Sequence, residues 1–217
     1  MFRTRSLFFA YNKHTSFHFP DIDLEAGENI LVLGESGIGK TTYLHLMAGI
    51  LKPKSGSAEL MGKTYHELKS SQLDRFRGQY IGLIFQKPHF IHALSLEENL
   101  TLVQSLAHKK TDKNRIHQVL DDLGIIRHKS KKTYLLSQGE QQRAAIAMAV
   151  VNQPKLLLAD EPTSSLDDKN CLKVANLLKE QAASTGAHLI IITHDQRLKS
   201  QFQNTIELQQ LQKPVLN

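Results

Sequence analysis

The chain has 217 residues, of which 41% are hydrophobic and 22% charged, with one cysteine and a formal net charge of +6. This composition excludes a disordered chain and a disulfide-stapled secreted module, and the lone cysteine fits a reducing compartment. The apolar run 144–151 is far shorter than the roughly 18 residues of a membrane-spanning helix, and the run 7–11 is too short for a signal peptide, so we expect a cytosolic protein.

The sequence predicts short apolar strands that alternate with helices. Strands are expected over residues 28–33, 57–61, 80–85, 155–160 and 188–193, and helices over 41–50, 95–107, 112–123, 168–184 and from the capping box at Ser137 and Glu140 to before Pro154. Such strands are typical of a largely parallel sheet that helices cover on both faces. Because the stretch 87–152 holds no such strand, we expect one domain over 1–217, with an α/β core of 1–86 and 153–217 and an inserted helical subdomain of 87–152.

A glycine-rich segment between the first of these strands and the first helix fits a phosphate-binding loop. Its residues match the pattern G-x-x-x-x-G-K-[ST] and are Gly34, Glu35, Ser36, Gly37, Ile38, Gly39, Lys40 and Thr41. Glycines let consecutive backbone N–H groups turn toward phosphate oxygens, and the positive end of the following helix faces the same place. We expect Lys40 to neutralise the β- and γ-phosphates of a nucleotide and Thr41 to hold Mg²⁺. The alternative is a glycine-rich turn that binds no ligand.

Two acidic residues end the strand over 155–160. A parallel strand carries Asp160 to the C-terminal edge of the sheet, where ligands bind in such folds. Asp160 suits Mg²⁺, directly or through water, and Glu161 is placed to orient and polarise an attacking water as general base. The alternative is that both acids simply cap the following turn.

Further motifs follow in order along the chain. They are Gln86 after the strand residues 83–85, the segment 136–143 (LSQGEQQR), the tripeptide Ser165-Leu166-Asp167, and His194 after the last strand. Together with the phosphate loop and the acidic pair, these motifs resemble the ATP-binding cassette (ABC) family over nearly the whole chain. The resemblance implies a P-loop NTPase core of RecA-like α/β fold, a small antiparallel β subdomain and an inserted α-helical subdomain.

The resemblance also implies how a nucleotide is held. Tyr11 stacks on adenine in this interpretation, and its alternative is a strand tyrosine half buried in the sheet. The phosphate loop and the adjoining Thr42 bind ATP. The implied metal ligands for Mg²⁺ are Thr41, Gln86 and Asp160, and the implied catalytic residues are Gln86, Glu161 and His194.

The family signature is implied to act on a second copy of the chain. Ser137, Gln138, Gly139 and Glu140 begin a helix whose positive end would bind the γ-phosphate of ATP held by the partner subunit, so that two cassettes sandwich two nucleotides head to tail. Asp167 belongs to the D-loop in this interpretation. Gln138 departs from the family pattern because it replaces the first glycine of the signature.

The function implied by the resemblance is that of an ATPase subunit of an ABC transporter. It would power separate transmembrane permease subunits through an ATP-bound homodimer, from the cytoplasmic face of the inner membrane. Segments such as 73–77 and 96–100 are similar to the lipoprotein-release, macrolide-export and cell-division cassettes. The alternatives are an ABC-type ATPase of a non-transport complex, such as a cell-division complex, and a non-catalytic binding module.

Positive charge is concentrated in one window. Residues 108–132 contain eight basic and three acidic residues, a net charge of +5, so the rest of the chain carries +1. The alternatives for this window are a solvated helical surface, a face toward an anionic membrane or partner, and a nucleic-acid contact. No nucleic acid is expected as a partner, because a nucleic-acid-binding protein would spread its positive charge more widely. The loop 87–92 just after Gln86 contains Phe90 and Ile91, and the resemblance implies that a permease docks there.

Overall fold

The computed structural model describes residues 1–25, 27–164 and 166–209, and within them the strands form two five-stranded sheets. The parallel sheet has the order β10-β4-β9-β8-β7; the other sheet is antiparallel, with the order β2-β1-β5-β6 and β3 paired to β1. The strands are β1 (Phe2–Ala10), β2 (Ser16–His18), β3 (Ile22–Leu24), β4 (Asn29–Leu33), β5 (Ser55–Leu60), β6 (Lys63–Thr64), β7 (Ile81–Ile84), β8 (Leu156–Asp160), β9 (His188–Thr193) and β10 (Asn204–Glu207).

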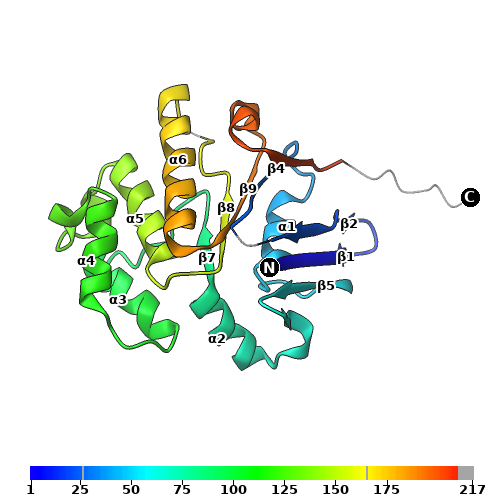
Figure 1. Cartoon of the computed structure of the whole chain (residues 1–217), viewed down its shortest axis with the longest axis horizontal. Helices are drawn as coiled ribbons and strands as arrows, with labels where there is room; N and C mark the ends of the chain where they lie inside the picture. The colour runs from blue at the N-terminus through cyan, green and yellow to red at the C-terminus, as the bar shows by residue number, and fades with distance from the viewer. Residues whose placement is uncertain (26, 165, 210–217) are drawn as a thin grey trace, which may run out of the picture.

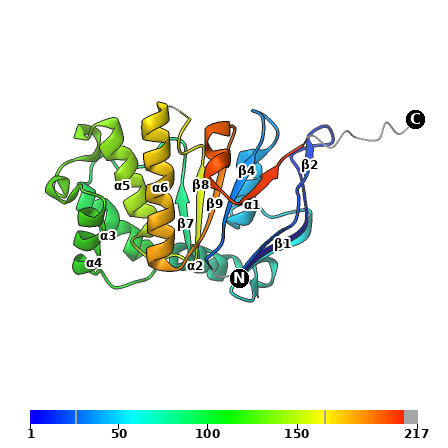
Figure 2. The same cartoon turned by 45° about the horizontal axis from the view of Figure 1, so that its top comes forward.

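The described α-helices pack beside the sheets, and α3, α4 and α5 gather at one end of the molecule. The α-helices are α1 (Lys40–Met47), α2 (Ser70–Tyr80), α3 (Leu96–Leu106), α4 (Lys113–Asp122), α5 (Gln138–Val150) and α6 (Asp168–Thr185). Short 3₁₀ helices are η1 (Tyr65–Glu67), η2 (Ile126–His128), η3 (Thr133–Leu135) and η4 (Gln196–Gln201). Figure 1 shows α3, α4 and α5 together at one end of the molecule and the antiparallel sheet at the other, with the parallel sheet between them; Figure 2 shows the same arrangement from a second side.

The central strands of the parallel sheet, β4, β8 and β9, are buried on both faces because most of their residues are apolar. Successive residues of a strand point to opposite faces. In β9, Leu189 and Ile191 therefore belong to the apolar core shared with α3 to α6, whereas Ile190 and Ile192 belong to the core shared with α1 and the antiparallel sheet. Burying one such side chain contributes roughly 1.5–3 kcal/mol, so this run holds both layers of the molecule to one sheet.

The carboxyl ends of four parallel strands meet at one edge of the sheet. In the strand register, Leu33 is opposite Thr193, Asp160 is opposite Ile192, and β7 ends beside β8. The phosphate loop, Gln86, Glu161 and His194 come directly after these strand ends. The topology thus gathers four distant parts of the sequence at one place, as it does in open α/β sheets generally.

Most of the predicted elements are present with boundaries shifted by a few residues. The sequence pattern does not predict α2, β6 or β10, and it does not separate the individual N-terminal strands. Phe76 is the one buried residue of α2, so this helix lacks the apolar periodicity that reveals a helix in a sequence. Among the described residues, none of the helices is both long enough and apolar enough to span a membrane.

Candidate nucleotide site

The phosphate loop takes a conformation that requires glycine at two positions. Gly37 and Gly39 have φ angles of 83° and 98°, in the left-handed region that side-chain-bearing residues avoid. A Cβ atom at Gly39 would also lie 2.6 Å from the ring of Phe17, so there is no space for one. The loop turns tightly into α1, which begins at the next residue, Lys40. The first backbone N–H groups of α1 therefore point out of the helix at the end of the loop.

Lys40 is the buried cation of this loop. Its side chain is only 7% exposed, and its Nζ donates to the carbonyl oxygens of Gly34 at 2.8 Å and Glu35 at 2.9 Å. The same Nζ lies 3.2 Å from Oε1 of Glu161. A charge this deeply buried needs partners, and here the loop and the carboxylate supply them.

Thr41 and Asp160 form an oxygen pair beside Lys40. The hydroxyl of Thr41 donates to Oδ2 of Asp160 at 2.9 Å. The other carboxylate oxygen, Oδ1, is buried and has no hydrogen-bond partner. Burial raises the pKa of Asp160, and the neighbouring Glu161 raises it further against the hydrogen bond from Thr41. An unsatisfied buried carboxylate oxygen next to a hydroxyl fits a hard divalent cation such as Mg²⁺.

Glu161 is held in a strained conformation by several contacts. Its φ angle is 49°, which is uncommon for a residue other than glycine, and its N–H donates to the carbonyl of Ile192 at 2.8 Å. Its Oε2 accepts from the hydroxyl of Thr193 at 2.8 Å, and its Oε1 lies 2.9 Å from Nδ1 of His194. Burial alone would raise the pKa of this carboxyl, but the hydrogen bonds from His194, Thr193 and Lys40 outweigh it and lower the pKa. Glu161 is therefore ionised at neutral pH.

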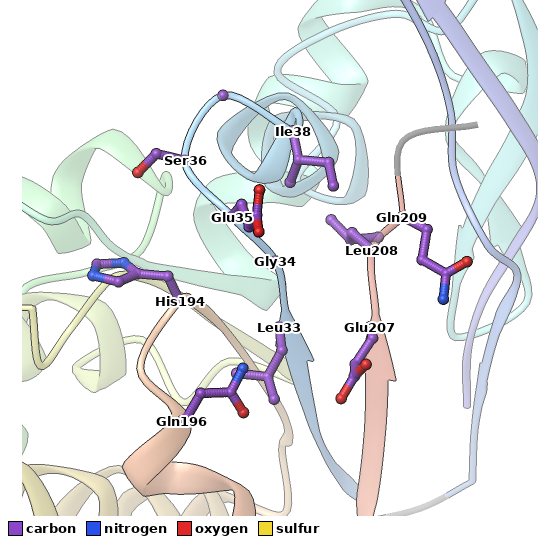
Figure 3. Close-up of a pocket in the computed structure, with 11 residues that line it drawn as sticks. Leu33, Gly34, Glu35, Ser36, Ile38, His194, Gln196, Glu207, Leu208 and Gln209 are labelled. Atoms are coloured by element: carbon purple, nitrogen blue, oxygen red, sulfur yellow. The ribbon is translucent and has the colours of Figure 1, made fainter. Parts of the chain in front are cut away.

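The described part of the chain holds two hollows beside the phosphate loop. The smaller, about 360 Å³, is lined by Phe17, Ser36, Gly37, Gly39, Lys40, Thr41, Thr42, Gln86, Glu161 and His194. The larger, about 700 Å³, lies between the loop and the end of β10 and is lined by residues such as Gly34, Glu35 and Ile38 (Figure 3). The smaller cavity contains the buried lysine and the carboxylate of Glu161, and His194 borders both hollows.

The aromatic residues beside this cavity come from the antiparallel sheet. Tyr11 follows β1 directly, is 58% exposed, and its hydroxyl lies 3.1 Å from that of Thr42. Its exposed ring differs from the half-buried strand tyrosine that was the alternative. Phe17, which the sequence analysis missed, lines the cavity and meets Tyr11 edge-on at 6.4 Å between ring centroids. The alternation of Phe17 with Phe19 was the available sequence signal, but the pairing of β2 with β1 is what brings Phe17 to the loop.

Gln86 and Asp167, two of the expected site residues, differ in their position relative to the cavity. Gln86 lines the cavity and donates from Nε2 to the hydroxyl of Ser164 at 3.3 Å. Asp167 caps the N-terminus of α6 by accepting from the N–H of Asn170 and lines neither hollow. Ser165 lies outside the described residues.

The signature segment lies at the start of α5 and borders neither hollow. Ser137 is the N-cap, and its N–H and hydroxyl both donate to Oε2 of Glu140, at 2.8 and 2.9 Å. The Oε1 of Glu140 lies 2.7 Å from Nε2 of the buried His128. The hydrogen bonds from Ser137, aided by the charges of His128 and Lys131, lower the pKa of Glu140 to about 2. The chain therefore does not bring its own signature and phosphate loop to one cavity.

Comparison with known proteins decides the family. Residues 18–164, more than half of the chain, match the family described as ABC transporter. The chain belongs to the ABC transporter family. It is 37% identical over 185 residues to the lipoprotein-releasing system ATP-binding protein LolD of Idiomarina loihiensis. The aligned region covers 84% of this chain and 81% of that protein. The LolD of Legionella pneumophila is 34% identical over 190 residues, or 87% and 84% of the two chains.

Solved cassette structures share the fold. The dimeric bacterial ABC transporter cassette MJ0796 matches with a TM-score of 0.84 at 28% identity, covering 96% of this chain and 94% of that one. A dimeric post-hydrolysis state of MJ0796 bound to ADP and Pi matches with a TM-score of 0.83 at 27% identity and the same coverage. The expected fold is therefore confirmed, and so is the expected class of function: the chain is the ATPase subunit of an ABC transporter, and cassettes of this family bind ATP and dimerise.

Proposed function

We propose that this ABC ATPase binds ATP in the cavity of about 360 Å³ and that Glu161 is the general base of hydrolysis. The observation that carries this proposal is the position of Lys40 and His194 on the same carboxylate oxygen of Glu161, at 3.2 and 2.9 Å. A cation for phosphate and an ionised base for water thus meet in one cavity. The exposed ring of Tyr11 beside Thr42 offers a face to adenine.

The donor set for a divalent cation fits Mg²⁺ carried with ATP. Thr41 and Asp160 would hold it, with Gln86 from beyond the end of the neighbouring strand β7, and the unpartnered Oδ1 of Asp160 supports this assignment. When bound, the cation supplies charge neutralisation at the β- and γ-phosphates.

The contacts of Lys40 and Glu161 define how the chain's own residues act. Lys40 exchanges its contact with Glu161 for phosphate oxygens when ATP binds. The freed carboxylate of Glu161 accepts the proton of a water as the water oxygen bonds to the γ-phosphorus and the bond to the leaving ADP oxygen breaks. His194 and Thr193 keep the carboxylate in position through this exchange.

Substitution of the base tests this proposal. Glu161→Gln keeps the size of the side chain and removes the proton acceptor, so we expect ATP binding near the parental level and turnover lower by about 10²- to 10⁴-fold. Measurement of ATP affinity by fluorescent nucleotide titration and of phosphate release gives both values. Comparable phosphate release by the variant and the parent would remove Glu161 from this role.

The signature is proposed to act in a homodimer. Because Ser137 borders neither hollow of its own chain, its donors reach a phosphate only on a second copy. The dimeric MJ0796 cassettes, which this chain matches over nearly its full length, support a head-to-tail pair.

We infer further that the partner is a transmembrane permease at the inner membrane and that the system releases lipoproteins. The relatives named LolD support this substrate class over the cell-division alternative. The docking loop is proposed to be 87–92. Phe90 packs against the core, but Ile91 is 52% exposed, and the buried amide of Asn99 fixes it by accepting from its N–H at 2.9 Å and donating to its carbonyl at 3.2 Å. A rigid exposed apolar side chain suits a protein contact.

The basic window lies partly beside this loop. Lys132 donates to the carbonyl of Ala93, whereas Lys109 and Arg115 donate to the carbonyls of Asn152 and Val150 at the end of α5. The latter two cations therefore cap a helix, which is a structural role. Lys132 supports a position of the window next to the permease and the anionic inner leaflet.

Replacement of the exposed apolar residue tests the docking surface. We expect Ile91→Ala to leave basal ATPase activity within twofold of the parent, because Ile91 lies in an exposed loop. The variant should lose most co-purification with the permease. Met61→Ala, at a similarly exposed apolar residue after β5, is the matched control and should co-purify normally. Parental co-purification of the Ile91 variant would place the docking surface elsewhere.

A further inference from the structure

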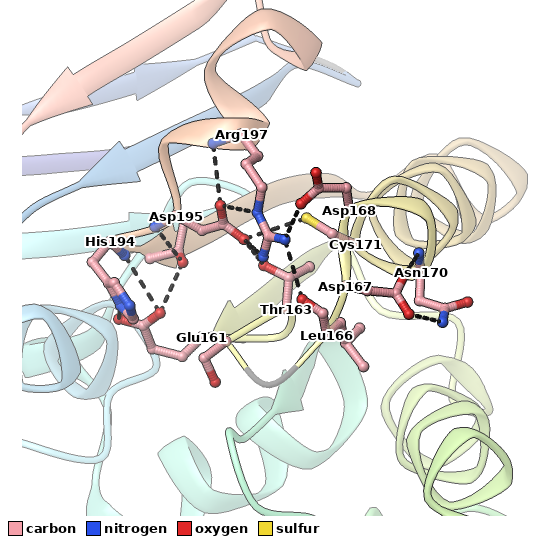
Figure 4. Close-up of polar contacts among 12 residues, drawn as sticks. Glu161, Thr163, Leu166, Asp167, Asp168, Asn170, Cys171, His194, Asp195 and Arg197 are labelled. Atoms are coloured by element: carbon pink, nitrogen blue, oxygen red, sulfur yellow. Dashed lines mark hydrogen bonds and ion pairs between the residues drawn. The ribbon is translucent and has the colours of Figure 1, made fainter.

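A polar cluster centred on Arg197 lies beside Glu161 and His194 (Figure 4). Arg197 belongs to η4, which follows β9, and its Nε and Nη2 donate to the two carboxylate oxygens of Asp195, each at 2.8 Å. Its Nη1 reaches the opposite way, donating to the carbonyl of Leu166 at 3.1 Å and to Asp168 at 2.6 Å. One guanidinium therefore joins the chain after β9 to the chain after β8.

Asp195 also connects the two segments directly. Its Oδ2 also accepts from the hydroxyl of Thr163 at 2.9 Å and from Sγ of Cys171 at 3.3 Å. Asp195 is 8% exposed, and the bidentate pair with Arg197 holds the pKa of its carboxyl far below the ordinary value. The pair also raises the pKa of Arg197, so both groups stay charged throughout the range in which the protein works. Paired charges with this geometry fix distance and direction more firmly than a single hydrogen bond.

The two connected segments each begin with a residue of the hydrolytic site. Glu161 stands two residues before Thr163, and His194 stands one residue before Asp195. Glu161 has a φ angle of 49°, a strained conformation that persists only where surrounding contacts determine it. Its direct contacts to Ile192, Thr193 and His194 all come from the segment at β9. A loose attachment between the segments would let Glu161 relax away from them.

We propose that Arg197 is a positioning residue for ATP hydrolysis: its guanidinium clamps the segment carrying Glu161 to the segment carrying His194 and so holds the general base in its strained position. This inference rests on the proposed role of Glu161. Arg197 lines neither hollow beside the phosphate loop, so it acts through Glu161 and not on the nucleotide.

The clamp predicts a separation of turnover from binding. Arg197→Gln removes the charge and the bidentate pair with Asp195. Because a displaced catalytic group can lower the rate by up to about 100-fold, we expect kcat to fall by at least about tenfold. The KM and affinity for ATP should stay within about twofold, because Lys40 and Tyr11 have no contact with the cluster among the described residues. Arg197→Lys keeps the charge without the fork and should recover part of kcat.

Two further variants separate the clamp from general stability. Asp168→Asn loosens only the exposed end, since this side chain is 88% exposed, and should lower kcat less than Arg197→Gln without affecting folding. Lys199→Gln removes a cation of the same helix whose partner, Glu207, lies on β10, and it should keep the parental kcat. Thermal unfolding of each variant shows whether the fold is retained.

A double-mutant cycle with Glu161→Gln gives the deciding result. If Arg197 acts through Glu161, then Arg197→Gln added to Glu161→Gln lowers the residual single-turnover rate no further. The proposal is overturned if the two losses multiply, if Arg197→Gln and Asp168→Asn both turn over at the parental rate, or if KM and ATP affinity change as much as kcat. Undiminished turnover of Glu161→Gln alone is a different result, because it removes the base that the clamp is said to position.

Discussion

The starts of α1 and α5 are the two helix N-termini that we propose bind phosphate, and they are built differently. The start of α1 has Gly39 at the N-cap, no side-chain cap and no acidic residue in its first turn. The start of α5 has Ser137 at the N-cap and Glu140 three residues later in a complete capping box. Both helix starts carry the positive end of a helix dipole, but at α5 the ionised carboxylate of Glu140 already lies there.

In the proposed function, this difference gives the two ends different tasks. The start of α1 would bind phosphate as soon as a nucleotide arrives, with Lys40 buried beside it. At α5, Ser137 would have to exchange Glu140 for a phosphate oxygen, so we expect this end to bind an anion weakly on its own. A weak anion site suits a signature that contacts the nucleotide only after the partner chain has bound ATP. The affinity for ATP in the dimer then depends on both chains.

The largest effect on ATP binding should come from a substitution at the start of α1. Lys40→Ala leaves phosphate charge without its cation, and the loss of a charged hydrogen bond of about 1.5–3 kcal/mol corresponds to ATP binding weaker by roughly 10- to 100-fold. Turnover should be lost with it. Lys54→Ala, at an exposed lysine after α1, is the control and should bind normally. An unchanged ATP affinity in the Lys40 variant, measured by nucleotide titration, would contradict the assignment of the phosphate loop.

A smaller effect should come from separating the two ends onto different chains. Ser137→Ala and Lys40→Ala should each be inactive alone, but a head-to-tail mixed dimer contains one site with an intact Lys40 and an intact Ser137. Random pairing makes half of the dimers mixed, so the mixture should show about a quarter of the parental rate if the two sites turn over independently. ATPase assays on the separate and mixed proteins decide this. A mixture as inactive as its components would mean that the signature does not act on the partner's nucleotide.

The two ends also differ in how much the sequence could predict. The loop at α1, the acids after β8 and His194 were all predicted, because each follows a buried apolar strand and parallel strands end at one edge. At α5 the capping box was predicted from Ser137 and Glu140, but not its link to His128. That contact depends on how η2 packs beside α5, and nothing in local spacing shows it.

The same limit applies to the fold and to the support of the site. The apolar strands β4, β8 and β9 were predicted to within a residue at each end, whereas α2 was missed because it buries so little. Arg197 has no sequence signature, because its partners Leu166 and Asp168 lie about 30 residues away and meet it only when β8 and β9 pair. Groups at strand ends are therefore predictable, and groups that brace one loop against another are not.

The smallest effect concerns the charge that occupies the start of α5. The pKa of Glu140 is lowered from 4.5 to about 2 in the folded chain, so its stabilising contribution is complete above the ordinary pKa and is lost as the pH falls from about 4.5 toward 2. Glu140→Gln keeps the capping box and removes the charge. We expect the variant to unfold at a lower temperature than the parent at pH 7, and the difference to shrink as the pH falls from about 5 to 3.

A second capping box provides the control for this measurement. Glu98 pairs with Ser95 at the start of α3, but its side chain is 57% exposed against 16% for Glu140, and its nearest cation, Lys132, is 3.8 Å away. Its pKa is also lowered, first by the hydrogen bonds from Ser95. Glu98→Gln should therefore give a smaller decrease in Tm at pH 7 than Glu140→Gln, because solvent screens the more exposed charge. Two outcomes would contradict this expectation: equal decreases in Tm for the two variants, or a difference in Tm that does not change with pH. Either would mean that the contact with His128 does not strengthen the stabilisation by the Glu140 carboxylate. The contrast between the starts of α1 and α5 would then have no electrostatic basis.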